Sequence, residues 1–344
     1  MAIVASPSPS VVTDLVDDAS SDWQQSLRRA VRDPDELCRR LELPAEYTAA
    51  ARRAAALFGV FVPQEYLNRM RRADPYDPLL RQVLPLGEEF RAANEYTDDP
   101  VGDGEALAAP GLLHKYDSRV LLVTTGACAV HCRYCFRRHF PYAAMPKRAD
   151  DWQPALDRIA ADATIEEVIL SGGDPLTLLD ARLAELVHRL EGIEHLRRLR
   201  IHTRLPIMIP SRMTRPLLDC LGGTRLTTLM VIHANHAAEI DDEVASALST
   251  LVAAGMPTLN QSVLLRGVND DADALVELSK RLVDIGVMPY YLHQLDRVRG
   301  AAHFEVPVDR GIAIVEQMRT RLPGYAVPRF VQEIPGAAHK QTLA

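Results

Sequence analysis

Between residues 120 and 293, short apolar runs alternate with longer stretches in which apolar residues recur at the spacing of an amphipathic helix. Short apolar runs bounded by turn residues are typical of buried strands. We predict six strands, at residues 120–124, 167–170, 199–203, 228–233, 259–264 and 288–293. The helices predicted between them include residues 151–162, 180–190, 241–253 and 271–284.

Strands that alternate with helices predict an α/β fold with a parallel sheet and right-handed crossovers, either curled into an open partial barrel or doubly wound. Functional residues of such sheets gather at the carboxyl ends of the strands. Five of the six predicted strands end in, or are followed by, polar or reactive residues: Cys128, Gly172-Gly173-Asp174, Arg204, His233 and Asp296. This edge of the sheet is therefore the predicted site.

The N-terminal third of the chain has a different pattern. Residues 23–70 show helical spacing with proline punctuation, whereas residues 74–111 are rich in proline, glycine and acids and predict a loop-rich connector. We expect four regions: a disordered tail at 1–20, a helical accessory region with its connector at 21–110, the barrel or sheet at 111–300 and a C-terminal segment at 301–344.

The composition narrows the class of function. The 344 residues are 47% apolar and 25% charged, so the chain can bury a large core, and a net charge of −7 gives no electrostatic footprint for nucleic acid. Residues 1–10 do not have the pattern of a signal peptide, and no apolar run approaches the roughly 20 residues that span a bilayer. We expect a small-molecule substrate, no nucleic-acid or membrane partner, and a cytoplasmic location.

Three of the five cysteines lie close together, as Cys128-x3-Cys132-x2-Cys135. Three thiolates on a short loop suit three irons of a [4Fe-4S] cluster and leave the fourth iron open for a ligand. Structural zinc is the alternative, since His131 or His139 could supply the fourth protein ligand that zinc requires.

The segment 132–136, Cys-Arg-Tyr-Cys-Phe, completes a motif that resembles the signature of the radical SAM superfamily. The resemblance implies a partial (β/α)6 barrel in which the open iron binds S-adenosylmethionine (SAM) and the reduced cluster cleaves SAM to a deoxyadenosyl radical. It also implies that Gly172, Gly173 and Asp174 receive the amino group of SAM. Without the cysteines, a Gly-Gly-Asp segment is a common turn.

Longer blocks, at residues 113–119, 132–140, 260–269 and 288–293, resemble the lysine 2,3-aminomutase family. The resemblance covers nearly the whole chain and is closest to the short branch, which makes (R)-β-lysine for the modification of elongation factor P. The chain stops four residues after Lys340, without the cysteine-bearing extension of the long catabolic members, which favours the short branch. The resemblance implies pyridoxal phosphate (PLP) as a further cofactor.

Lys340 matches the lysine that holds PLP as an imine in this family. By position alone, Lys340 would be a solvated tail residue, and the family's glycine run before it is interrupted here by two alanines and a histidine. Lys115, Tyr116 and Arg119 match the family's contacts to the PLP phosphate. Lys115 stands where the family has an arginine, so it offers a point charge in place of a planar fork.

Substrate recognition follows from the same resemblance. Arg137 matches the residue that binds the α-carboxylate, a group for which arginine is well suited. Asp296 and Glu333 match the two positions that bind the distal ammonium of lysine, with Glu333 one methylene longer than the usual aspartate. Two carboxylates at these positions would repel a glutamate side chain. The remaining candidates are His233 and Gln261 on the SAM side, and Arg204 and Arg212 as anion contacts near a strand end.

The implied reaction converts L-lysine into (R)-β-lysine by a radical 1,2-amino shift on PLP, with SAM regenerated at the end. The implied partners are an electron donor such as flavodoxin or ferredoxin and, indirectly, the ligase that attaches β-lysine to elongation factor P. Two alternatives stay open: a catabolic or biosynthetic lysine or glutamate 2,3-aminomutase, and a non-catalytic iron–sulfur protein. The second would not explain Lys340, Arg137 and the two acids together.

Overall fold

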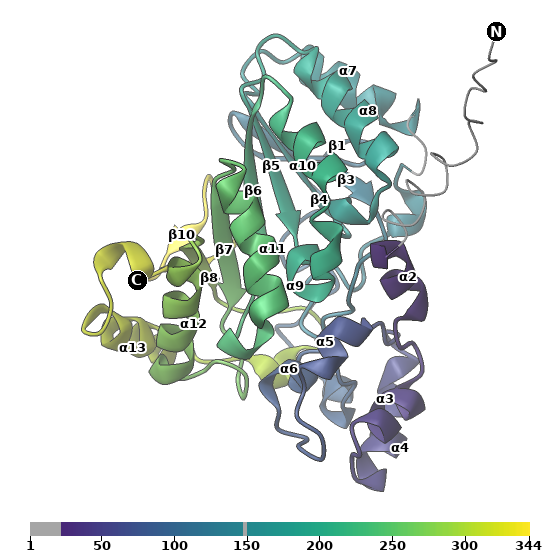
Figure 1. Ribbon diagram of the computed structural model, residues 1–344, viewed down its shortest axis with the longest axis vertical. Coiled ribbons are helices and arrows are strands. Elements are labelled where there is room, and N and C mark those ends of the chain that lie inside the picture. The colour runs from purple at the N-terminus through teal and green to yellow at the C-terminus, as the bar shows by residue number, and fades with distance from the viewer. Residues whose placement is uncertain (1–21, 147–149) are drawn as a thin grey trace, which may run out of the picture.

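One ten-stranded sheet forms the framework, and its strands are paired in chain order from β1 to β10 (Figure 1). The computed structural model describes residues 22–146 and 150–344, so the predicted tail at residues 1–20 lies outside the described residues. The strands are β1 (Leu107–Ala109), β2 (Leu112–Tyr116), β3 (Arg119–Thr125), β4 (Glu167–Gly172), β5 (Arg198–Thr203), β6 (Thr227–His233), β7 (Thr258–Val263), β8 (Met288–His293), β9 (Arg329–Gln332) and β10 (Gln341–Thr342).

The strands from β3 to β9 are parallel, and all six predicted strands are among them, so the predicted parallel sheet is confirmed. Because each of these strands pairs with the next one in the chain, the right-handed crossovers all place their helices on the same face. A doubly wound sheet needs a reversal of strand order. The described strands have none, and the fold is an open partial barrel. Figure 1 shows the covering helices on one side of the sheet: α7 (Gln153–Ala160), α8 (Asp180–Glu191), α10 (Arg215–Gly222), α11 (Asp242–Ala253) and α12 (Ala272–Asp284).

The covering helices begin at side-chain caps and bury one stripe of residues. The Asp241 carboxylate accepts a hydrogen bond from Val244 N at 2.9 Å at the start of α11, and Asp271 accepts one from Ala274 N at 2.8 Å at the start of α12. The buried stripe of α11 has helical spacing and consists of Val244, Ala247, Leu248 and Leu251. Such stripes pack on every second residue of the strands, which leaves the alternate residues for the inner face of the barrel.

Four strands were not predicted from the sequence: β1, β2, β9 and β10. In the tight hairpin between β2 and β3, Tyr116 pairs with Arg119, and Ser118 adopts a positive φ of 63°. At the other edge of the sheet, β10 pairs antiparallel with β9 and sets Gln341 opposite Gln332. Strands of two to five residues contain too few alternations to stand out in the hydrophobic pattern.

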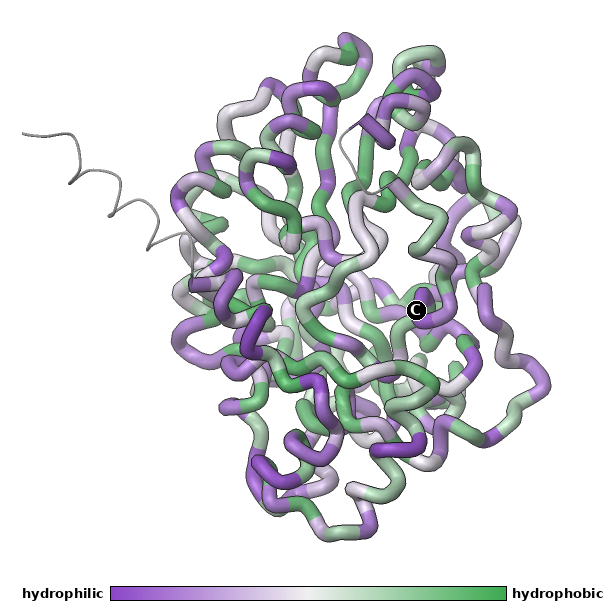
Figure 2. The backbone as a smooth tube through the Cα atoms, turned by 90° about the vertical axis from the view of Figure 1, so that its right-hand side faces the viewer, coloured by the Kyte–Doolittle hydropathy of each residue, from purple (hydrophilic) through white to green (hydrophobic). Residues whose placement is uncertain are grey.

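The N-terminal region contains five short α-helices among the described residues, the last of them within the predicted connector. Its helices are α2 (Asp22–Arg29), α3 (Pro34–Arg40), α4 (Ala45–Ala55), α5 (Gln64–Asn68) and α6 (Pro78–Arg81). Their buried residues belong to the same apolar cluster as the outer face of the barrel and its helices. Figure 2 shows apolar segments running through the interior and hydrophilic ones at the outer turns. No helix in residues 22–146 and 150–344 is long and apolar enough to cross a membrane.

Gly311 marks a close contact between α13 (Val308–Arg319) and β9. A Cβ atom on Gly311 would lie 2.5 Å from Cζ of Phe330 and 2.9 Å from the Leu264 side chain. We expect Gly311→Ala to lower the free energy of unfolding by about 1–3 kcal/mol, because overpacking displaces neighbours in a close-packed core. Gly222→Ala is the control, since its added Cβ would meet no atom within 4 Å outside its own helix and its chain neighbours. Urea unfolding followed by circular dichroism compares the two variants, and equal stabilities would contradict this packing.

Candidate functional site

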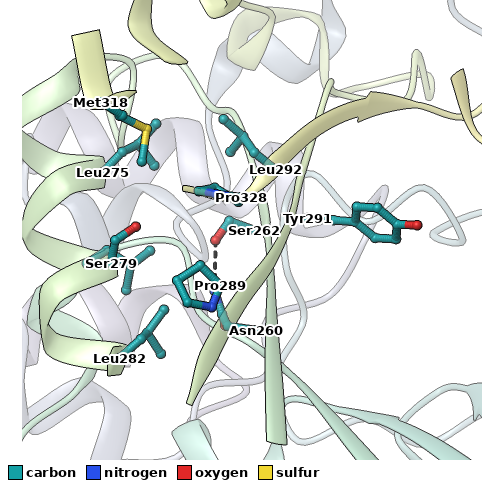
Figure 3. Close-up of a pocket in the computed structure, with 11 residues that line it drawn as sticks. Asn260, Ser262, Leu275, Ser279, Leu282, Pro289, Tyr291, Leu292, Met318 and Pro328 are labelled. Carbon is teal, nitrogen blue, oxygen red and sulfur yellow. Dashed lines mark hydrogen bonds between the residues drawn. The ribbon is translucent and has the colours of Figure 1, made fainter. Parts of the chain in front are cut away.

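The inner face of the barrel carries the polar residues at the strand ends. His202, His233, Gln261 and His293 are half-buried there, and His233 pairs in register with Gln261. The opposite face is tightly packed, because the cavity between α12 and strands β7 and β8 measures only about 10 Å³. Figure 3 shows Tyr291 pointing away from this cavity, toward the inner face. A cavity of that size has room for about one water molecule, so it is too small to hold an amino-acid substrate.

The cysteine loop, residues 126–136, begins where β3 ends and is held by backbone hydrogen bonds. Asp174 N donates to Ala127 O at 2.7 Å, and Arg133 N donates to Gln82 O at 2.8 Å. Burial raises the pKa of the Cys128 thiol well above its usual value and that of Cys135 to about 11. Thiolates in this loop therefore need compensation by a cation or a cluster. The three half-buried cysteines are Cys128, Cys132 and Cys135.

The three thiols suit a cluster better than a single ion. Within residues 22–146 and 150–344, no three Cys, His, Asp or Glu side chains converge as ligands of one metal ion. In a cubane each thiolate binds a different iron, so the thiols do not have to converge. The two histidines considered as a fourth zinc ligand each place one ring nitrogen near a backbone carbonyl: Nδ1 of His131 lies 2.9 Å from Gly59 O, and Nε2 of His139 lies 3.2 Å from Arg299 O.

A buried group of charges anchors the cysteine loop to the N-terminal region. Arg133 donates from Nε and Nη2 to the two carboxylate oxygens of Glu89, at 2.8 and 2.6 Å, and Arg138 Nη2 donates to the same carboxylate at 2.7 Å. Arg133 is fully buried and Glu89 is 3% exposed. Sequence reasoning missed Glu89, because its partners lie 44 and 49 residues further along the chain.

The Gly172-Gly173-Asp174 segment begins at the last residue of β4 and packs against the cysteine loop. A Cβ atom on Gly173 would collide with Ala127 O, and Gly172 has a φ of 109°, so both positions require glycine. The Asp174 carboxylate accepts a hydrogen bond from Arg204 N at 2.7 Å. The segment thus joins the cysteine loop to the end of β5, and its contact with SAM stays a prediction.

Of the two arginines predicted as anion contacts, only Arg204 lies at the cysteine loop. Its Nη1 donates to Cys132 Sγ at 2.7 Å, and its Nη2 donates to Glu239 at 2.8 Å. Arg212 instead pairs with Asp180 at 2.7 Å, at the first residue of α8. Arg212 therefore ties two covering elements together, whereas Arg204 offers a positive charge to an anionic cluster.

His233 also contacts the cysteine loop. Its Nε2 lies 3.0 Å from the hydroxyl of Tyr134, and the two rings are stacked with their centroids 5.8 Å apart. Burial and the nearby charge of Arg204 lower the pKa of His233 well below its usual value, so the ring is neutral. His233 and its neighbour Gln261 on β7 therefore lie beside the cysteine loop, and their contact with SAM stays a prediction.

The Lys340 side chain is held by an ion pair with Glu333 and is half-buried. The β9–β10 hairpin brings it opposite Glu333, and Nζ of Lys340 forms an ion pair with the Glu333 carboxylate. Tyr116 donates its hydroxyl to Oε1 of Glu333 at 2.6 Å. Burial opposes ionisation of Glu333, but Lys340 keeps the pKa of that carboxyl below its usual value. The Arg119 guanidinium lies 4.5 Å from the centroid of the Tyr116 ring.

A network of charged side chains links Lys115 to Arg137 through Asp103. Oδ1 of Asp103 lies 2.6 Å from Lys115 Nζ, and Oδ2 accepts a hydrogen bond from Arg137 Nε at 2.7 Å. Lys115 Nζ also lies 3.9 Å from Glu333 Oε1, so this network reaches the carboxylate that pairs with Lys340. Asp103 was not predicted, because no local pattern distinguishes it from the other acids of the connector.

Asp296, in the loop after β8, belongs to the same electrostatic group. Burial raises its pKa to about 7, while the charge of Lys340 acts in the opposite direction. Burial and Lys340 together lower the pKa of His293 to about 3. An incoming cation would favour ionisation of Asp296, because opposite charges stabilise the charged form of a carboxyl.

Comparison with known proteins agrees with this geometry. The sequence profile of the Radical SAM superfamily matches residues 122–279, so fold and cysteine loop together define a radical SAM protein. The L-lysine 2,3-aminomutase of Escherichia coli (strain K12) is 48% identical over 94% of this chain and 94% of its own length. The L-lysine 2,3-aminomutase of Haemophilus influenzae is 46% identical over 94% of this chain and 95% of its own length. The L-lysine 2,3-aminomutase of Clostridium subterminale is 35% identical over 95% of this chain and 79% of its own length. The chain belongs to the lysine 2,3-aminomutase family of radical SAM isomerases.

Membership of this family implies a [4Fe-4S] cluster, SAM and PLP as cofactors, and the residues present fit them. For the cluster, the chain offers three half-buried thiols with the guanidinium of Arg204 beside them. For PLP, it offers the half-buried amine of Lys340, which shares Glu333 with Lys115 and Tyr116.

We expect Gly173→Ala to lower the iron and sulfide content of the reconstituted protein severalfold, because the added Cβ displaces Ala127 and with it the cysteine loop. Gly324→Ala is the control, since no described atom lies within 4 Å of its added Cβ. Iron and sulfide are assayed after anaerobic reconstitution, with circular dichroism to verify folding. A folded Gly173→Ala variant with full iron content would show that the cluster does not depend on this contact.

Proposed function

We propose that this protein isomerises L-α-lysine to (R)-β-lysine. One observation supports the proposal: Arg137 is linked through Asp103 and Lys115 to the Glu333 carboxylate that pairs with Lys340, and the charge of Lys340 also acts on Asp296. An α-amino acid with a distal ammonium presents complementary charges, a carboxylate for the arginine and a cation for the acids. A glutamate side chain would instead place a third carboxylate beside two others in a buried site, which is costly.

When bound, the cluster and SAM supply a carbon-centred radical, and PLP holds the migrating nitrogen. In this proposal Lys340 holds PLP, and Lys115, Tyr116 and Arg119 bind its phosphate. Lys115 donates one hydrogen bond to Val101 O at 2.7 Å and forms an ion pair with Asp103, so its ammonium still has donors for the phosphate. The remaining ligands are Cys128, Cys132 and Cys135 for the cluster and Gly172, Gly173, Asp174, His233 and Gln261 for SAM. Fixing these groups on one scaffold is the contribution of the chain.

We further propose that the β-lysine serves the modification of elongation factor P. The match to the Escherichia coli and Haemophilus influenzae relatives over 94% and 95% of their own length supports the short branch of the family. A separate ligase would then attach the product, so contact with elongation factor P is indirect. The electron would come from a small flavin or iron–sulfur protein such as flavodoxin or ferredoxin.

Anaerobic turnover tests the proposed reaction. Protein reconstituted with iron, sulfide and PLP receives SAM, dithionite and either L-lysine or L-glutamate, and chiral chromatography identifies the product. We expect (R)-β-lysine from lysine and no product from glutamate. Lys340→Ala should lose both turnover and the absorbance of covalently bound PLP while it keeps its iron. Conversion of glutamate but not lysine would refute the substrate, and an unchanged PLP spectrum in the variant would refute the role of Lys340.

Asp296 should make lysine binding dependent on pH. Because burial raises its pKa to about 7, the carboxyl is largely protonated below that pH in the free protein and cannot form an ion pair with the substrate ammonium. The KM for lysine should therefore fall as the pH rises from about 6 to about 8. Asp296→Asn should raise KM at the higher pH and remove the slope. A wild-type KM that stays constant across this range would contradict the assignment.

A further inference from the structure

The connector between the helical region and the barrel crosses the carboxyl ends of the strands. Thr97 N donates to Arg297 O at 3.0 Å, in the loop after β8. Further along, Gly102 approaches the β9–β10 loop, since a Cβ atom on Gly102 would lie 3.3 Å from the Pro335 side chain. Residues 97–104, named here the connector segment, thus pass from the Asp296 loop to the segment that carries Lys340.

Hydrogen bonds within the connector segment fix the backbone at Asp103. The Asp99 carboxylate accepts hydrogen bonds from Asp103 N at 2.9 Å and from Gly104 N at 2.8 Å, which fixes the turn. The Asp103 side chain is 2% exposed and contacts both Arg137 and Lys115. Although burial opposes ionisation, these two cations hold the pKa of Asp103 below its usual value. Asp103 is therefore an ionised carboxylate.

The contacts of Arg137 leave one end of its guanidinium available. Nε is occupied by Asp103, and Nη1 donates to Ser171 Oγ at 3.3 Å. Among the described residues, no partner accepts a hydrogen bond from Nη2, and the guanidinium carbon lies 4.7 Å from the centroid of the Phe136 ring. A guanidinium has five N–H donors in a fixed fork, so the terminal nitrogens can still bind a second carboxylate.

We propose that Asp103 is the positioning residue that sets Arg137 for the α-carboxylate of the substrate, an inference that rests on the proposed function. Asp103 holds the guanidinium through Nε, so that Nη2 stays available for the substrate carboxylate. Lys115 neutralises Asp103, so Arg137 keeps a net positive charge for the substrate. Asp103 acts through Arg137 and does not contact the substrate itself.

The test separates the carboxylate of the ligand from its other groups. Reconstituted holoenzyme without reductant is titrated with L-lysine or with L-lysinamide, which lacks the carboxylate, and the absorbance of bound PLP reports each Kd. Asp103→Asn should weaken lysine binding about tenfold or more and lysinamide binding less than about twofold, because a charge-assisted contact to the carboxylate is disturbed. Asp103→Glu, which keeps the charge, should recover part of the loss. Glu105→Gln, an exposed neighbour in the chain, is the control and should match wild type.

Two further measurements decide between a positioning and a merely structural role. Iron and PLP contents of Asp103→Asn should equal those of wild type, and in an Arg137→Ala background Asp103→Asn should add little further loss of lysine affinity. Equal weakening for lysine and lysinamide, or loss of iron and PLP in step with affinity, would overturn the proposal. A wild-type protein that binds lysine but does not convert it would refute the proposed function. The change in Kd for lysine relative to that for lysinamide would still decide the role of Asp103.

Discussion

Each parallel strand from β3 to β9 pairs with the strand that follows it in the chain, and the rest of the molecule depends on this pairing. With no reversal of strand order, all crossovers lie on one face and all carboxyl strand ends meet at one edge. Loops far apart in the sequence are thereby brought together. The residues gathered at that edge are Cys128, Gly172, Arg204, His233, Asp296 and Glu333.

Buried charge pairs then hold these loops in place. A desolvated ion pair contributes little net stability, but removing one partner typically costs about 3–5 kcal/mol, so such pairs select one geometry over others. Each pair joins a loop at the strand ends to a different part of the chain. The pairs are Arg133 with Glu89, Arg204 with Glu239, and Arg137 with Asp103.

The cysteine loop and the Lys340 group meet at Arg137. Arg137 follows the last cysteine by two residues, and through Asp103 and Lys115 it is linked to the carboxylate that pairs with Lys340. The groups that fit a cluster and those that fit PLP are therefore continuous on one inner face. The connector, which the sequence pattern marks only as a loop, closes this link.

Local pattern was sufficient for the strands and covering helices of the barrel, because alternating burial repeats along each element. The cysteine spacing predicted the chemistry of the loop, and resemblance to a family singled out Lys340, which its place near the chain end would have dismissed. The short strands β9 and β10, the separation of Arg204 from Arg212, and the roles of Glu89 and Asp103 were decided only by the tertiary structure. The physical reason is that these features depend on contacts between residues far apart in the sequence, such as Asp103 with Arg137, or on strand pairing too short to show a period. The spacing of apolar residues indicates which face of a helix or strand a residue occupies. Only the folded structure decides which charged residue becomes its ion-pair partner.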